Sequence, residues 1–209
     1  MARKTQEESQ ETRKNILECA KRLFSKRGYE RTSLSDIAKY SGVSRGAIYW
    51  HFESKEDLLI NLVEYVDNNT DCVRYFFESA SPTEQDPLSK LKSFILNMFT
   101  EELSEYFNSS FVNMLIGIEN GFTGNDEARA KLAELDKQRM AMLSKIIMNC
   151  VAKGQLPQNL NIRAATEHLA VFMSGFFFQS RMKNTETLKK HYSQIVDMEI
   201  DQLKQLVQP

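Results

Sequence analysis

The chain has 209 residues, with 27 Lys and Arg against 28 Asp and Glu, a formal net charge of −1, and only 8 Gly and 4 Pro. No apolar run approaches the roughly 20 residues of a membrane span, and the charged start lacks the apolar core of a secretion signal, so we expect a cytoplasmic protein with no membrane partner. The cysteines are far apart and form no CxxC pair, which predicts reduced thiols and gives no support for a redox role of Cys72; they are Cys19, Cys72 and Cys150.

The first predicted element is an amphipathic helix over residues 10–27, with apolar residues from Ile16 to Phe24 on its inner face. It lies in a basic segment. Residues 1–55 contain 12 Lys and Arg against 7 Asp and Glu, a net charge of +5, and the rest of the chain has a net charge of −6. Because phosphate binding needs local positive charge, this asymmetry favours contact with nucleic acid. A chance imbalance on an ordinary charged surface is the alternative.

Two short helices are predicted next, near residues 34–41 and 45–51. Ser33 and Asp36 have the spacing of a capping box, and Gly42 stands where a helix ends in a left-handed conformation. Ser44 is a second N-cap, and Ile48 is the apolar anchor of the helix that it begins. Helices this short are not stable alone, so the pattern indicates a helix-turn-helix held by a packed core.

The second short helix has the composition of a recognition helix. Such a helix needs a basic fork for base edges or phosphates, small residues for close approach, and hydroxyls or aromatics for the backbone. The alternative is a solvated turn whose aromatic side chains pack inward. We predict that the bases are contacted from the start of this helix and the phosphates from its end, with the DNA-contacting residues Thr32, Ser33, Leu34, Ser44, Arg45, Gly46, Ala47, Tyr49, Trp50, His51 and Lys55.

The remainder of the chain also has a helical pattern. Strand-like alternation is scarce, and turns are marked by Pro, Gly and Asn. We therefore predict an all-α fold of about nine helices, in which residues 1–54 form the DNA-binding domain and residues 55–209 a larger body. The predicted body helices span residues 55–79, 88–103, 108–120, a long segment ending at 153, 162–182 and 186–207.

The last two predicted helices have wide apolar faces that need a cover. One cover is the rest of the domain, and the other is a second copy of the chain in a four-helix bundle. The residues alone favour neither.

No set of residues has the pattern of a catalytic or metal site. The three histidines are isolated from one another, and no P-loop, nucleophile elbow or metal-ligand spacing occurs; they are His51, His168 and His191. We expect no enzyme, no cofactor and no metal.

The first 60 residues resemble the DNA-binding domain of the TetR family of bacterial transcriptional repressors. The opening residues and the run RGAIYWHF narrow this to the branch that resembles AcrR and TtgR, local repressors of multidrug efflux-pump genes. The resemblance implies a homodimer, a palindromic double-stranded DNA operator and a small-molecule effector. The residues that carry it are Thr12-Arg13, Ile16, Ala20, Leu23-Phe24, Gly28-Tyr29, Thr32-Ser33-Leu34, Asp36-Ile37-Ala38, Gly42-Val43-Ser44, Gly46-Ala47-Ile48-Tyr49-Trp50-His51-Phe52, Lys55 and Leu58.

Beyond these residues the chain is rich in Met and Phe, which suits an adaptable apolar pocket, although for each residue taken singly plain core packing is the favoured explanation. The resemblance places Asp67 where the branch has an acidic residue that faces cationic drugs, and Asn113 and Ser174 at polar pocket positions. Asp67 as a solvated helix charge is the alternative. The residues Ile118 to Phe122 depart from the branch pattern, which puts the ligand class in doubt. The predicted ligand-binding residues are Asp67, Asp71, Met98, Asn113, Met114, Met140, Met173, Ser174 and Phe177.

The function expected from these observations is a ligand-responsive repressor that binds its operator as a dimer and is released by hydrophobic or cationic compounds. A second reading on the same fold is an activator or global regulator of other pathways with a different ligand. The third is a helical interaction protein without DNA binding.

Overall fold

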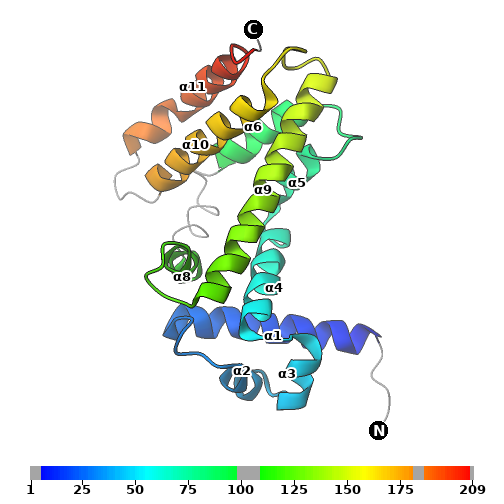
Figure 1. Ribbon diagram of the computed structural model, residues 1–209, viewed down its shortest axis with the longest axis vertical. Coiled ribbons are helices and arrows are strands. Elements are labelled where there is room, and N and C mark those ends of the chain that lie inside the picture. Colours follow the sequence, from blue (N-terminus) through cyan, green and yellow to red (C-terminus); the bar gives the residue numbers. More distant parts are fainter. Residues whose placement is uncertain (1–5, 98–108, 181–185, 208–209) are drawn as a thin grey trace. The chain divides into compact units, whose positions relative to one another are not determined.

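The computed structural model describes residues 6–97, 109–180 and 186–207, and these residues are helical with short connections. The all-α prediction is confirmed, and the described residues contain ten helices (Figure 1). Their only β-type pairing is an isolated antiparallel bridge between Leu160 and Val207. The helices are α1 Gln6–Arg27, α2 Leu34–Ser41, α3 Arg45–His51, α4 Lys55–Asn68, α5 Asp71–Ser79, α6 Pro87–Asn97, α8 Ser110–Glu119, α9 Asp126–Ala152, α10 Ile162–Ser180 and α11 Glu186–Leu203.

The chain divides into two compact units. The first contains residues 1–67 and 109–135, and the second contains residues 68–108 and 136–209. The functional division expected between residues 54 and 55 stays a prediction, because compactness does not decide which residues bind DNA or ligand.

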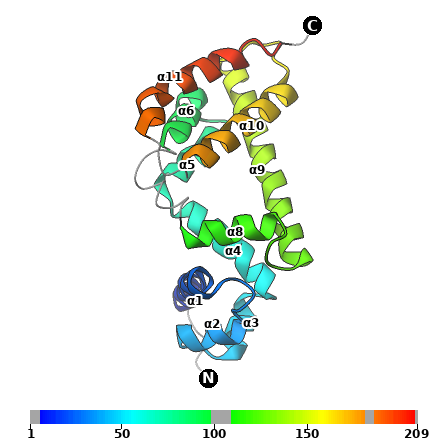
Figure 2. The same ribbon diagram turned by 90° about the vertical axis from the view of Figure 1, so that its left-hand side faces the viewer.

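In the first unit, α1 contacts both α2 and α8, and α2 contacts α3 (Figure 2). Large apolar side chains from five helices fill the space between these elements. Burying a side chain of this size contributes about 1.5–3 kcal/mol, which gives α2 and α3 the stability that their length denies them. The fully buried side chains include Ile16, Leu17, Phe24, Ile37, Ile48, Leu58, Leu59, Leu62 and Phe111.

In the second unit, α5 packs against α6, and α11 contacts both α6 and α10. The rings of Phe76 and Phe94 lie 5.2 Å apart in this core. The last helices form an antiparallel pair (Figure 2), and their ends are tied where the Asn161 amide donates to the Leu206 carbonyl at 2.7 Å.

The prediction of one long helix over residues 55–79 is wrong in one respect. It is interrupted between Asn68 and Asp71, so Asp67 lies in α4 and Cys72 in α5. The physical reason is a run of Asn, Thr and Asp residues, whose side chains compete with helical backbone hydrogen bonds. Thr70 is the N-cap residue of α5, with extended backbone angles.

Helix ends differ from the prediction elsewhere. α1 begins four residues earlier than expected, and α11 ends at Leu203 rather than near residue 207. The chain leaves the helix there because Val207 pairs with Leu160, a partner that local sequence does not specify. Residues 98–103, predicted as the end of a helix, lie outside the described residues. Among the described helices, none is long and apolar enough to cross a membrane.

Candidate nucleic-acid interface

The turn between α2 and α3 is built from local hydrogen bonds. Ser33 Oγ accepts from the Asp36 amide at 3.1 Å, and the Asp36 carboxylate accepts from the Ser33 amide at 2.9 Å, so the capping box is present. The same serine also lowers the pKa of the Asp36 carboxyl, since its hydroxyl and amide both donate to the carboxylate. At the other side of the turn, Ser44 Oγ accepts from the Ala47 amide at 3.1 Å and begins α3.

Gly42 ends α2 with φ +73° and ψ +19°, the left-handed conformation expected for it. An alanine there has room for its methyl group, since nothing lies within 4 Å, but it must adopt this strained conformation. We expect Gly42→Ala to reduce the free energy of unfolding by about 1–2 kcal/mol, measured by chemical denaturation.

Gly46→Ala is the matched control for that variant. Gly46 lies in α3 without a positive φ, and its new Cβ would lie 3.9 Å from Ser44 Oγ, so no loss of stability is expected. Equal destabilisation by the two substitutions would contradict the role of the left-handed turn.

α3 presents two different faces. Ile48 is fully buried, while Tyr49 is 59% and Trp50 72% exposed. Arg45 and Gly46 are also exposed, and Ala47 is half-buried. A helix held by one buried anchor and carrying exposed basic, small and aromatic residues is what major-groove recognition requires.

His51 and Lys55, the other predicted phosphate contacts, are half-buried. The His51 ring contacts Trp50 edge-on, with ring centroids 4.6 Å apart. The Lys55 ammonium lies 4.1 Å from the centre of the Tyr29 ring and donates to the Tyr29 carbonyl at 3.3 Å. Lys55 is therefore oriented by the connection between α1 and α2.

The structure does not place Thr32 and Leu34 as expected for DNA-contacting side chains. Thr32 is 1% and Leu34 8% exposed, and the Thr32 hydroxyl donates to the Gly28 carbonyl at 2.9 Å. Their side chains therefore belong to the packed interior. Leu34 is buried because the short α2 must bury its apolar face to be stable. Sequence spacing could not separate this role from contact with DNA.

The predicted ligand-binding residues are divided between the two units. In the first unit, Asp67 is buried, Asn113 is exposed and Met114 is half-buried. In the second unit, Met173 is half-buried, and Ser174 is exposed with its hydroxyl donating to the Ala170 carbonyl. Met140 is 37% exposed. Met98 and the side chains of Asp71 and Phe177 lie outside the described part of the structure, so the residues are not brought together as one described site.

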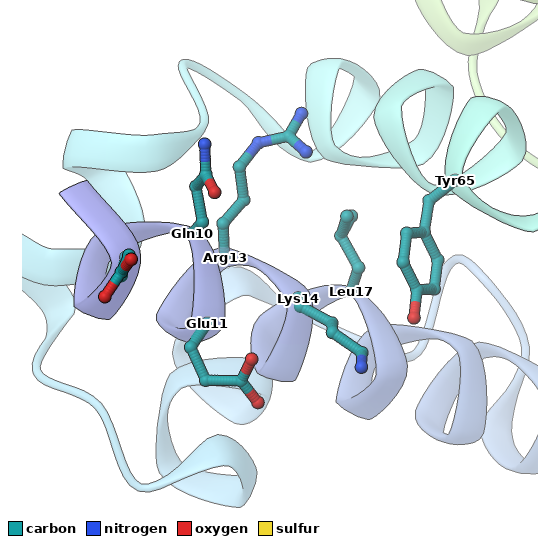
Figure 3. A pocket seen from close by; sticks show the side chains of 7 residues that line it. Gln10, Glu11, Arg13, Lys14, Leu17 and Tyr65 are labelled. Atoms are coloured by element: carbon teal, nitrogen blue, oxygen red, sulfur yellow. The ribbon is translucent and has the colours of Figure 1, made fainter. Parts of the chain in front are cut away.

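A separate depression of about 650 Å³ lies on the first unit, between α1 and Tyr65 of α4 (Figure 3). Figure 3 shows side chains of both charges along α1. The Tyr65 hydroxyl donates to Glu18 at 3.0 Å. None of the predicted ligand-binding residues lines this depression. Its lining residues are Glu7, Gln10, Glu11, Arg13, Lys14, Leu17 and Tyr65.

Similarity to known proteins agrees with this geometry. A family profile described as bacterial regulatory proteins of the tetR family matches residues 16–62. The chain is 34% identical over 182 residues to the HTH-type transcriptional regulator TtgR of Pseudomonas putida. The aligned region covers 84% of this chain and 82% of TtgR. It is 33% identical over 179 residues to the HTH-type transcriptional regulator AcrR of Shigella flexneri, covering 84% and 80%.

The chain belongs to the TetR family. This TetR-family protein also shares its fold with SmeT, described as the repressor of the Stenotrophomonas maltophilia multidrug efflux pump SmeDEF. The SmeT–triclosan complex superimposes with a TM-score of 0.69 at 20% identity, covering 91% of this chain and 90% of SmeT. The protein is accordingly a DNA-binding regulator and not an enzyme.

Proposed function

We propose that this TetR-family protein is a ligand-responsive repressor that binds a palindromic operator as a homodimer and controls multidrug efflux-pump genes. The proposal assigns residues 1–54 to DNA binding and residues 55–209 to ligand binding and dimerisation, in the cytoplasm. It draws support from the similarity to TtgR and AcrR along most of the chain and from the fold shared with SmeT, an efflux-pump repressor.

The observation that carries the proposal is the exposed face of α3. Arg45, Tyr49 and Trp50 project from a helix whose anchor Ile48 is fully buried. An exposed tryptophan is unfavourable in water, and a basic helix with such a side chain is suited to contact with DNA bases and phosphates.

The proposal is tested by selecting duplexes from a random-sequence pool with the wild-type protein. The expected product is a palindrome with half-sites about one helical turn apart, bound with an affinity that falls as salt rises. Absence of an enriched sequence at low salt would contradict operator binding. The position of the footprint in the native promoter then separates a repressor, which overlaps the polymerase site, from an activator.

The homodimer is proposed from the apolar surface of the last two helices. Val171 of α10 is 74% exposed and Met198 of α11 is 66% exposed. Two copies of this helix pair, related by a two-fold axis, would remove these side chains from water in a four-helix bundle.

We expect Val171→Glu to convert the dimer into a monomer and to abolish tight operator binding, because a charge would be buried in the bundle. Sedimentation velocity measures the first effect. Met148→Glu is the matched control, since Met148 is an exposed apolar residue on α9 and should leave the dimer intact. Dimers of unchanged stability in both variants would contradict this interface.

The effector is proposed to be a hydrophobic or cationic compound. Asp67 is buried at the end of α4, twelve positions from Lys55, a distance of about 18 Å along a helix. A ligand that binds better to one position of α4 therefore shifts the proposed DNA-binding domain, residues 1–54, at the Lys55 end of this helix. Its differential affinity for the two states sets the size of the effect.

Asp67→Asn tests this part of the proposal. The substitution removes the negative charge and keeps the size of the side chain, so release of the operator by cationic compounds should weaken while release by neutral compounds such as triclosan is retained. Titration of the protein–operator complex with one compound of each kind measures the difference. An equal loss for both would contradict a charge-specific pocket role.

A further inference from the structure

Glu56 has a position that operator recognition through α3 does not account for. It is the second residue of α4, directly after Lys55, and its side chain is 7% exposed. A carboxylate is rarely buried to this degree unless hydrogen bonds compensate for lost water.

Two hydrogen bonds to one carboxylate oxygen provide that compensation. The Tyr29 hydroxyl donates to Glu56 Oε1 at 2.7 Å, and the Asn125 side-chain amide donates to the same oxygen at 2.9 Å. Burial alone would raise the pKa of the Glu56 carboxyl, but these two donors, together with a backbone hydrogen bond and the charge of Lys55, hold it below its ordinary value. Glu56 is therefore an ionised acceptor that joins two distant segments of the first unit.

The segment on the Asn125 side is the start of α9. Asn125 Oδ1 accepts from the Ala128 amide at 2.8 Å, which is an N-cap hydrogen bond, and the Gly124 amide donates to Glu30 at 3.1 Å. The turn between α8 and α9 is thus bound to Glu30, in the connection between α1 and α2, and to Glu56, at the start of α4.

The segment on the Tyr29 side reaches the predicted phosphate contact. The Tyr29 ring lies beneath the Lys55 ammonium, and its carbonyl accepts from Lys55 Nζ and from the Thr32 amide. Burial and the hydrogen bond to Glu56 raise the pKa of the Tyr29 hydroxyl, which stays a donor at neutral pH. A shift of Tyr29 would move Lys55 and the beginning of α2 together.

We propose that Glu56 is a positioning residue for operator binding, which holds Tyr29 and Lys55 in place and couples them to the α8–α9 turn through Asn125. The inference rests on the proposed function. It adds a connection from the start of α9 to Tyr29 and Lys55, made through Glu56 at the end of α4 opposite Asp67. Loosening of the Asn125 contact would lower operator affinity even where every DNA-contacting residue is intact.

The test exchanges the donor and the acceptor. Asn125→Asp retains an acceptor for the N-cap but places a carboxylate against Glu56 in place of the amide donor. Glu56→Gln added to that variant supplies a new donor to the introduced carboxylate and an oxygen for the Tyr29 hydroxyl. The operator is a duplex selected from a random pool by the wild-type protein, and its affinity is measured by fluorescence anisotropy.

We expect Asn125→Asp to weaken operator binding by roughly five- to thirtyfold, the loss that accompanies one buried hydrogen bond and a new repulsion. The double variant should recover to within about twofold of wild type. Circular dichroism and the fraction of protein competent to bind are measured for each variant, so that unfolding is not mistaken for weak binding.

Two results would overturn the inference. One is wild-type affinity in folded Asn125→Asp, and the other is a double variant no better than the single one. Either leaves the proposed function standing, because the wild type still binds its operator. A wild-type protein that selects no duplex would remove the proposed function and this inference together.

Discussion

Replacing Phe52 by alanine is expected to reduce the free energy of unfolding by about 3–5 kcal/mol, the usual cost of removing a buried phenylalanine. Phe52 follows α3 and is 1% exposed, its amide donates to the Ile48 carbonyl at 2.9 Å, and its ring lies 5.3 Å from the Arg13 guanidinium. The substitution leaves a cavity beneath the recognition helix and removes a cation–π contact with α1. Denaturant unfolding followed by circular dichroism measures the loss.

Trp50→Ala is the matched control, two positions earlier in the chain. Trp50 is 72% exposed, so its removal should change stability by no more than about 0.5 kcal/mol. Operator affinity should nevertheless fall, because the aromatic side chain belongs to the predicted contact surface. A Phe52→Ala variant as stable as Trp50→Ala would contradict the packing described for this head.

Arg45→Ala is expected to have the largest effect on DNA binding among substitutions in α3 itself. Arg45 is the first residue of α3 and is exposed. If its guanidinium contacts a base, the loss is about 1–3 kcal/mol per half-site and discrimination at that position relaxes. Anisotropy titrations against the selected operator and against point-mutated half-sites measure both effects.

A phosphate contact by Arg45 would give a different pattern. Binding would weaken equally for all sequences. The slope of log affinity against log salt concentration would become shallower by about one unit per half-site. Lys145→Ala is the control, since Lys145 is an exposed lysine of α9 outside the basic segment. Unchanged operator binding by Arg45→Ala would remove Arg45 from the interface.

Several features of the head could be predicted because they are encoded by neighbouring residues. Ser33 and Asp36 close their capping box within one helical turn, and Gly42 alone supplies the left-handed end of α2. The burial of Ile48 follows from being the one large aliphatic residue in a short helix of otherwise polar, small and aromatic residues. The basic head, the all-helical body and the resemblance to the TetR family rest on the same local information.

The burial of Thr32 and Leu34 shows where that information ends. Thr32 and Leu34 lie in the same short stretch as Ser33, yet their side chains are buried and that of Ser33 is exposed. The apolar periodicity of residues 55–79 continues past the break at Asn69 and hides it, although the Asn, Thr and Asp residues there favour an interruption.

The sequence by itself determined the helix-turn-helix, its caps, its exposed basic helix and the family, because each depends on contacts between residues a few positions apart. Only the tertiary structure decided that Glu56 is buried between Tyr29 and Asn125. One carboxylate oxygen of Glu56 accepts hydrogen bonds from both residues, which lie 27 positions before and 69 positions after Glu56 in the chain. No local spacing encodes such a contact, because it forms only when packing brings the start of α9 to the head.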